Sequence, residues 1–144
     1  TYYVPTISAG MFVAEKAKES GYYPPIIVPK ALEIGPRLLN TFTTAYKFGI
    51  KIAFGTDSGV SYHGDNAKEF FYMVRGGMTE MEAIRSATVI ASEMLGINDK
   101  LGSIESGKLA DIIAVKGNPI KDISFLQEVV FVMKEGKIYK SKIN

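Results

Sequence analysis

Two periods of apolar residues alternate along the first hundred positions, and together they predict a parallel α/β arrangement. Short β-branched and aromatic runs indicate strands at residues 2–8, interrupted by Pro5, and at residues 50–54. Apolar spacings of three and four predict helices between them, at residues 11–20 and 30–48. Strand, helix, strand is the order of a βαβ crossover unit, whose two strands lie parallel in one sheet.

The longer of these helices carries the clearest apolar stripe. Its members are Leu38, Leu39, Phe42, Ala45 and Tyr46. Gly35-Pro36 precedes the stripe and predicts either a kink or a restart of the helix.

Two further helices are predicted before residue 100. The first covers residues 66–75, with Asp65 as its cap. Its inner face is expected to consist of Ala67, Phe70, Phe71 and Val74. The second opens with Thr79-Glu80-Met81-Glu82, a capping box, and ends at Gly96.

The pattern changes near Lys100. Only short runs remain after it: a strand at residues 109–115, a helical turn at 123–127, and a hairpin around Glu135-Gly136. We therefore divide the chain into an α/β segment, residues 1–100, and a small β segment, residues 101–144.

Composition narrows the classes of function. Of 144 residues, 47% are apolar and 22% are charged, as in a soluble globular protein. The net charge is only +2 and the lysines are scattered, so no nucleic-acid binding is expected. No run approaches the roughly 20 apolar residues of a membrane span, so no membrane contact is expected. The absence of cysteine excludes a thiolate metal site and fits a cytoplasmic protein.

Asp57 is the best candidate for a residue that does chemistry. The predicted strand at residues 50–54 runs into Gly55, and the carboxylate follows two positions later. In parallel α/β proteins, reactive groups lie just past the carboxyl ends of strands. The alternative is an ordinary turn, because Asp, Ser and Gly are common turn formers.

The single histidine, His63, lies in the same predicted loop. Asp57, His63 and Asp65 are close enough in sequence to be imagined as metal ligands. A catalytic zinc normally has three protein ligands, most often histidines, and no histidine pair at ligand spacing is present. We therefore expect no metal site made by this chain alone. The glycines around Ser58 match neither a phosphate-binding loop nor a nucleophile elbow.

Short motifs occur in a fixed order along nearly the whole chain. They are Ile52-Ala53-Phe54-Gly55-Thr56-Asp57-Ser58-Gly59, His63-Gly64, Asn66, Gly77-Met78, Ala83, Ala87-Thr88, Leu101-Gly102-Ser103-Ile104, Gly107-Lys108-Leu109-Ala110-Asp111, Gly117-Asn118-Pro119 and residues 132–136. Their order and spacing resemble the C-terminal part of the amidohydrolase superfamily, nearest to its imidazolonepropionase-related, prolidase-like metallopeptidases.

The resemblance implies a fold, a cofactor and a reaction. The fold is the C-terminal portion of a TIM-like (β/α)8 hydrolase barrel followed by part of a small β-sandwich, with residues 2–8 as the seventh strand. The cofactor is one or two divalent ions, usually zinc. The reaction is hydrolysis of a C–N bond in a small molecule or dipeptide, as in an Xaa-Pro dipeptidase or a carboxypeptidase.

The resemblance also implies residue roles. Asp57 matches the family's aspartate on the eighth strand, which contacts the metal and accepts a proton from the metal-activated water. It would then pass that proton to the leaving amine. The family pattern gives no ligand role to His63, which is expected at the opening of the site, where it contacts the substrate or orders the loop.

The other ligands of the family pattern are absent from this chain. They are a His-x-His pair on the first strand, a lysine or acid on the fourth, and histidines on the fifth and sixth. A barrel needs about 250 residues, and the chain lacks an initial methionine. We therefore expect a fragment that is inactive by itself, with the N-terminal part of the same enzyme as its partner.

Two further expectations follow from a partial barrel. Uncovered strand edges and apolar surface predict self-association into a homo-oligomer. The absent ligands also leave open another class of function, a stand-alone α/β interaction module without catalysis. The coding sequence upstream of Thr1 distinguishes the two, because only a longer enzyme would carry the His-x-His strand there.

Overall fold

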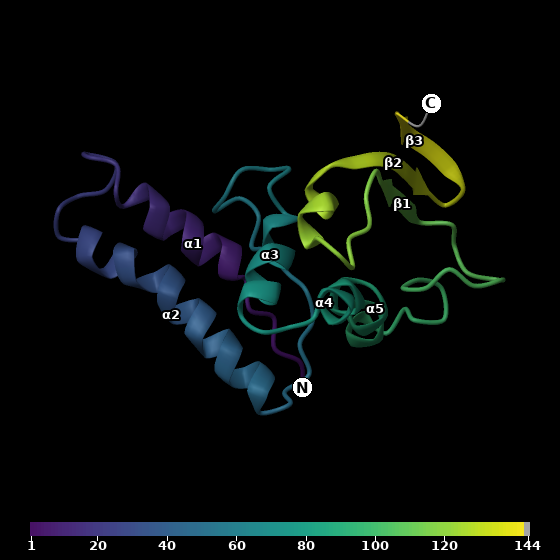
Figure 1. Cartoon of the computed structure of the whole chain (residues 1–144), viewed down its shortest axis with the longest axis horizontal. Coiled ribbons are helices and arrows are strands. Elements are labelled where there is room, and N and C mark those ends of the chain that lie inside the picture. Colours follow the sequence, from purple (N-terminus) through teal and green to yellow (C-terminus); the bar gives the residue numbers. More distant parts are fainter. Residues whose placement is uncertain (143–144) are drawn as a thin grey trace.

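Helices dominate the first part of the chain, and a small sheet follows them (Figure 1). The computed structural model describes residues 1–142. Its elements are, in order, α1 (Ile7–Lys16), α2 (Val28–Lys47), α3 (Lys68–Arg75), α4 (Glu80–Ala87), α5 (Val89–Leu95), β1 (Ile112–Val115), the 3-10 helix η1 (Ile123–Gln127), β2 (Val129–Lys134) and β3 (Lys137–Ser141). Among the described residues, none of the helices has the length and apolar content that crossing a membrane requires.

The two predicted parallel strands meet in a single bridge. Tyr3 pairs with Ile52 in parallel orientation. The Tyr3 N–H donates to the Lys51 carbonyl at 2.9 Å, and the Ala53 N–H donates to the Tyr3 carbonyl at 3.0 Å. The predicted partner and direction are confirmed. The predicted extent of the first strand is wrong, because α1 already begins at Ile7.

The start of α1 depends on a residue from another helix. Thr6 has a left-handed φ of 47° and makes no side-chain cap. Instead, both carboxylate oxygens of Glu69, on α3, accept hydrogen bonds from the first turn of α1. Ile7 N–H donates at 2.9 Å and Ser8 N–H at 2.7 Å. The sequence predicted this helix at residues 11–20, which places its start too late. The reason is that the acceptors for its first turn come from another helix and leave no signal in the local sequence.

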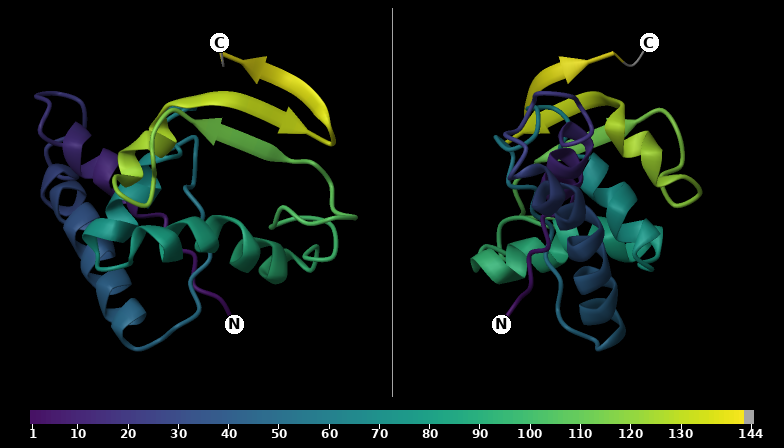
Figure 2. Two further views of the ribbon diagram at one scale, coloured as in Figure 1. Left: turned by 45° about the vertical axis from the view of Figure 1, so that its right-hand side comes forward. Right: turned by 90° about the vertical axis from the view of Figure 1, so that its left-hand side faces the viewer.

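Helices α1 and α2 lie side by side at one end of the molecule (Figures 1 and 2). Two glycines allow them to approach closely. A Cβ on Gly10 would lie 2.5 Å from Leu38 Cδ1, and one on Gly35 would lie 3.0 Å from the Gly10 carbonyl oxygen. α2 continues through Pro36, so the predicted restart does not occur.

The core lies where these helices and α3 cover the Tyr3–Ile52 bridge. Its buried members are Ile7, Phe42, Ile52, Met73, Met78 and Ala83. The predicted stripe of α2 is confirmed by Phe42, which is completely buried, with Tyr46 packed against the cluster. The predicted inner face of α3 is wrong in detail, because Glu69 and Met73 are buried while Phe71 is 46% exposed.

The capping box is confirmed, but the helix it begins is shorter than predicted. Thr79 Oγ1 accepts from the Glu82 N–H at 3.3 Å, and Glu82 Oε2 accepts from the Thr79 N–H at 3.0 Å. The predicted single helix is divided into α4 and α5 because Thr88, with φ −119° and ψ −91°, leaves the helical conformation.

The sheet consists of β1, β2 and β3 in antiparallel order and lies over α4 and α5 (Figure 2). The predicted hairpin is confirmed, with Lys134 paired to Lys137 across the turn. Glu135 and Gly136 have φ of 50° and 78°, as a two-residue hairpin turn requires. Asp111 Oδ1 accepts from the Glu135 N–H at 2.7 Å. This bond connects the turn to the residue just before β1.

Replacing Gly35 by alanine tests the contact between α1 and α2. Overpacking costs about 1–3 kcal/mol, whereas alanine gains up to about 1 kcal/mol in helix propensity. We expect a net loss of about 1 kcal/mol in the free energy of unfolding, measured by urea titration. Asn40→Ala, exposed on the same helix, is the control and should change stability by less than about 0.5 kcal/mol. Equal stability of the two variants would contradict the close contact.

Glu69 and Glu82 should give stability opposite dependences on pH. Burial raises the pKa of Glu69, and the hydrogen bonds from Ser8 and Ile7 lower it by less than burial raises it. Hydrogen bonds from Thr79, then Tyr46, lower the pKa of Glu82. A raised carboxyl pKa means that stability is lost as pH rises above the unfolded value of about 4.3. A lowered pKa means that stability is lost as pH falls below it.

Urea unfolding between about pH 3 and pH 8 measures both effects. Relative to the wild-type chain, Glu69→Gln should become progressively less destabilising as pH rises above about 4.3. Glu82→Gln should become progressively less destabilising as pH falls below that value. Differences from the wild-type chain that do not vary with pH would contradict both assignments.

Candidate active site

Asp57 lies where the Tyr3–Ile52 bridge gives way to a loop. Gly55 leaves no room for a side chain, because a Cβ there would overlap Val4 on the neighbouring segment. Two residues later, Asp57 is exposed and has a left-handed φ of 50°. This conformation is uncommon outside glycine, although Asp and Asn adopt it more readily than other residues. The carboxylate therefore reaches solvent directly after the end of the bridged segment, as the sequence predicted.

Asn66 holds the two ends of this loop together. Its Nδ2 donates to Thr56 Oγ1 at 3.2 Å, and its Oδ1 accepts from the Gly64 N–H at 3.2 Å. Beside Asp57, the Ser58 hydroxyl oxygen is buried and has no hydrogen-bond partner among the described residues. Buried polar atoms normally have a partner. Within the described part of the chain, Ser58 is therefore a buried, unpaired polar group that directly follows Asp57.

His63 and Asp65 do not form a metal triad with Asp57. Within residues 1–142, no group of three or more His, Asp or Glu side chains could hold a metal ion. His63 is exposed. Asp65 pairs with Lys68 at 2.8 Å, and it does not cap α3 through its side chain, contrary to the prediction.

The loop is also packed against α1 by aromatic side chains. The rings of Phe12 and Tyr62 meet edge to face, with centroids 5.3 Å apart. The Lys16 ammonium lies 5.7 Å from the Phe12 ring centroid, 5.9 Å from that of Tyr62 and 5.4 Å from that of Tyr22. Such cation–π contacts add to the attachment of the loop. The sequence did not predict this contact between the aromatic residues and the loop.

Glu69, on the helix that follows this loop, is a buried ionisable group whose role sequence reasoning missed. Its side chain is completely buried, and this burial raises the pKa of Glu69. The pKa of Tyr3 is also raised, mainly by burial of its phenol and secondly by the charge of Glu69. Both Glu69 oxygens accept backbone N–H groups, which suits an ionised carboxylate. One signal was available: Glu69 and Met73 are four residues apart and therefore share one helix face.

The Asp57 carboxylate is suited to bind the divalent ion that the family resemblance implies, as one of its ligands. Its side chain is exposed and makes no hydrogen bond within the described residues, so both oxygens are free. Carboxylates are common ligands of divalent ions. The described part of the chain therefore supplies one suitable ligand and not a complete metal site.

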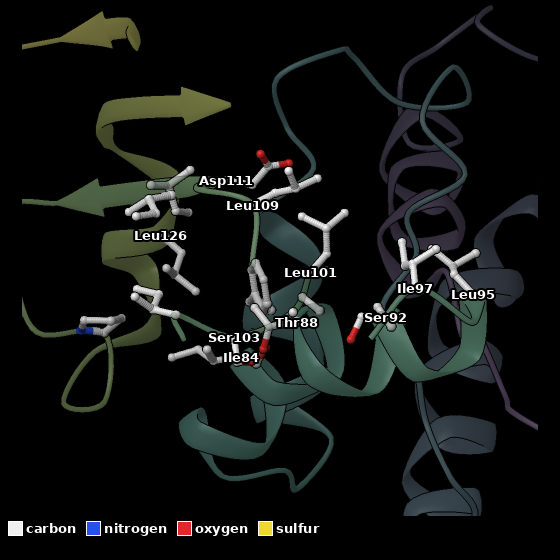
Figure 3. Close-up of a pocket in the computed structure, with 18 of the residues that line it drawn as sticks. Ile84, Thr88, Ser92, Leu95, Ile97, Leu101, Ser103, Leu109, Asp111 and Leu126 are labelled. Carbon is white, nitrogen blue, oxygen red and sulfur yellow. The ribbon is translucent and has the colours of Figure 1, made fainter. Parts of the chain in front are cut away.

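A separate, mainly apolar pocket of about 590 Å³ lies between α4, α5 and the segment that leads into β1 (Figure 3). Its wall includes Ile84, Leu95, Leu101, Leu109, Ile112 and Leu126. Neither Asp57 nor His63 lines it. Asp111, at its edge, already accepts the hydrogen bond from Glu135. The pocket therefore belongs to the packing between the helices and the sheet, away from the candidate carboxylate.

Several known proteins are similar to this chain in sequence and fold. The family model of the amidohydrolase family matches residues 1–139. A solved Xaa-Pro dipeptidase with methionine bound in its active site is 61% identical, with a TM-score of 0.93 over 98% of this chain and 35% of that one. A solved prolidase complexed with N-methylphosphonate-L-proline is 28% identical, with a TM-score of 0.84 over 99% of this chain and 36% of that one.

A curated protein is also similar to this chain. The ochratoxinase of Aspergillus niger is 41% identical over 107 residues, which is 71% of this chain and 22% of its own length. The chain thus spans about a third or less of the length of these relatives. Its mixed α/β structure is consistent with the C-terminal portion of a TIM barrel. The chain belongs to the amidohydrolase family, and its structural neighbours are prolidase-like members of that family.

Proposed function

We propose that this chain is the Asp57-bearing part of a metal-dependent hydrolase that cleaves the amide bond of a dipeptide or an acylated amino acid. One observation carries the proposal. An exposed carboxylate follows the bridged Ile52 segment in a chain that is 61% identical to a solved Xaa-Pro dipeptidase over 98% of its length. The prolidase complexed with a proline phosphonate supports the same class of substrate.

The proposed chemistry assigns one role to the ion and the proton transfers to Asp57. A divalent ion, when bound, lowers the pKa of water enough to supply a nucleophile at neutral pH. Asp57 would contribute one carboxylate ligand, take the proton of the attacking water, and give it to the leaving amine. Its free oxygens and exposed position support this exchange of protons with a substrate.

A neighbouring residue supports substrate binding at the same place. His63 is exposed in the loop that follows Asp57, where it can contact a substrate. His63 is therefore proposed to bind and orient the substrate.

The rest of the site is proposed to lie on the part of the enzyme outside this chain. Residues 1–100 would be the last two strands and helices of the barrel, and residues 101–144 part of a composite β-sandwich. The relatives are about three times as long as the chain, which leaves room for the remaining ligands. By itself, the chain is proposed to be inactive.

Substitution of Asp57 by asparagine tests the catalytic role. In the complete enzyme, we expect kcat on a dipeptide to fall by a factor of about 10²–10⁴, because asparagine cannot carry the proton. Stability should change little, since Asp57 is exposed and asparagine readily adopts a left-handed backbone. Asp65→Asn in the same loop is the control, with an expected kcat within about threefold of the original. Near-normal turnover by Asp57→Asn would exclude the assignment.

Calorimetric titration of the 144-residue chain with zinc chloride tests whether the metal site depends on other residues. We expect no tight stoichiometric binding, because a catalytic zinc normally has three protein ligands and the described residues contain no such group. Asp57→Asn should abolish any weak heat that remains. A tight one-to-one site would contradict the proposal that the remaining ligands lie outside this chain.

A further inference from the structure

The segment that follows Asp57 is attached to α1 at two places. The first is the aromatic contact of Tyr62 with Phe12, beside the Lys16 ammonium. The second is Glu69, whose carboxylate accepts the N–H groups of Ile7 and Ser8. These two contacts bracket residues 63–68. The two ends of this stretch are therefore fixed to α1, and hydrogen bonds such as that of Gly64 with Asn66 order the residues between them.

Asn66 lies between the two contacts and connects the start of α3 to the residue before Asp57. The Glu69 N–H donates to the Asn66 carbonyl at 3.2 Å, so Asn66 is bound to the first turn of α3. The Asn66 side chain in turn donates to Thr56, the residue directly before Asp57. A continuous series of hydrogen bonds thus runs from α1 through Glu69, Asn66 and Thr56.

A carboxylate suits this position better than a neutral side chain. The first turn of α1 is buried, and its N-cap Thr6 offers no side-chain acceptor. Its N–H groups therefore need an acceptor from elsewhere, and the N-terminus of a helix favours a negative charge. A glutamine at position 69 would accept only one of the two bonds, since its amide nitrogen would face the other N–H group.

We propose that Glu69 is a positioning residue for Asp57. It fixes the start of α3 to the N-terminus of α1 and, through Asn66 and Thr56, sets where the Asp57 carboxylate lies. Because Glu69 is completely buried, it is not proposed to contact the substrate. The catalytic consequence rests on the proposed function of Asp57, whereas the mechanical coupling between α1 and the loop does not.

Amide hydrogen exchange of the 144-residue chain tests the coupling. In Glu69→Gln, we expect exchange to accelerate by about tenfold or more at Ile7 and Ser8, which lose their acceptor. It should accelerate comparably at Val60 and Gly64, whose N–H groups are bonded within the Asp57 loop. Amides of the β2–β3 hairpin should keep their rates, which distinguishes local loosening from global unfolding.

Glu82→Gln is the matched control, because Glu82 also accepts a backbone N–H at the start of a helix. In that variant, exchange should accelerate at Thr79, whose N–H donates to Glu82. Val60 and Gly64 should keep their rates. If Glu69→Gln accelerates Ile7 and Ser8 but leaves Val60 and Gly64 unchanged, Glu69 only caps α1 and the proposal is wrong.

Kinetics of the complete enzyme on a dipeptide test the consequence for catalysis. Glu69→Gln should lower kcat by about tenfold to a hundredfold with KM within about twofold, since misplaced groups mainly slow the reacting step. Glu82→Gln should leave both constants unchanged. If the enzyme hydrolyses dipeptides and Glu69→Gln keeps its kcat, the positioning role is excluded. If no amide is hydrolysed by the unaltered enzyme, the proposed function fails, and the exchange experiment still decides the coupling.

Discussion

A buried carboxylate at the start of α1 is the contact on which the arrangement of the α/β part depends. Glu69 gives up its hydration to accept two N–H groups of a helix that would otherwise begin without an acceptor. Removing a charge from water is costly, and the two charge-assisted bonds together with the helix dipole offset only part of that cost, because the pKa of Glu69 remains raised. Because Glu69 is on α3, this exchange brings together two helices that flank the Asp57 loop.

The sequence predicted the features that local residues determine. The hairpin at Glu135-Gly136 was predicted because a two-residue turn with positive φ favours glycine, which Gly136 supplies. The capping box at Thr79 and helix α2 were also predicted, because both depend on residues three or four positions apart in the sequence. The early start of α1 could not be predicted, because its cap comes from Glu69, far along the chain. The break at Thr88 likewise has no helix-breaking glycine or proline as a signal.

In the candidate site too, the features that local sequence determines were predicted, and the contacts between distant residues were not. Asp57 was predicted from its place after a strand-like run and a glycine, and it is exposed directly after the Tyr3–Ile52 bridge. The attachment of its loop by Asn66, Tyr62 and Glu69 was not predicted, because charged and polar side chains near a helix start are usually interpreted as solvent-exposed. Spacing alone cannot reveal a partner on another helix.

The separation in sequence of these contacts also bears on the order in which the chain assembles. The Glu69 bonds close loops of 62 and 61 residues, whereas the β2–β3 hairpin closes across two residues. The entropy lost on closure grows with loop length, so hairpins and single helices can form before distant contacts do. The carboxylate can lose its water favourably only after both helices exist. We therefore expect correct placement of the Asp57 loop to be a late event in folding.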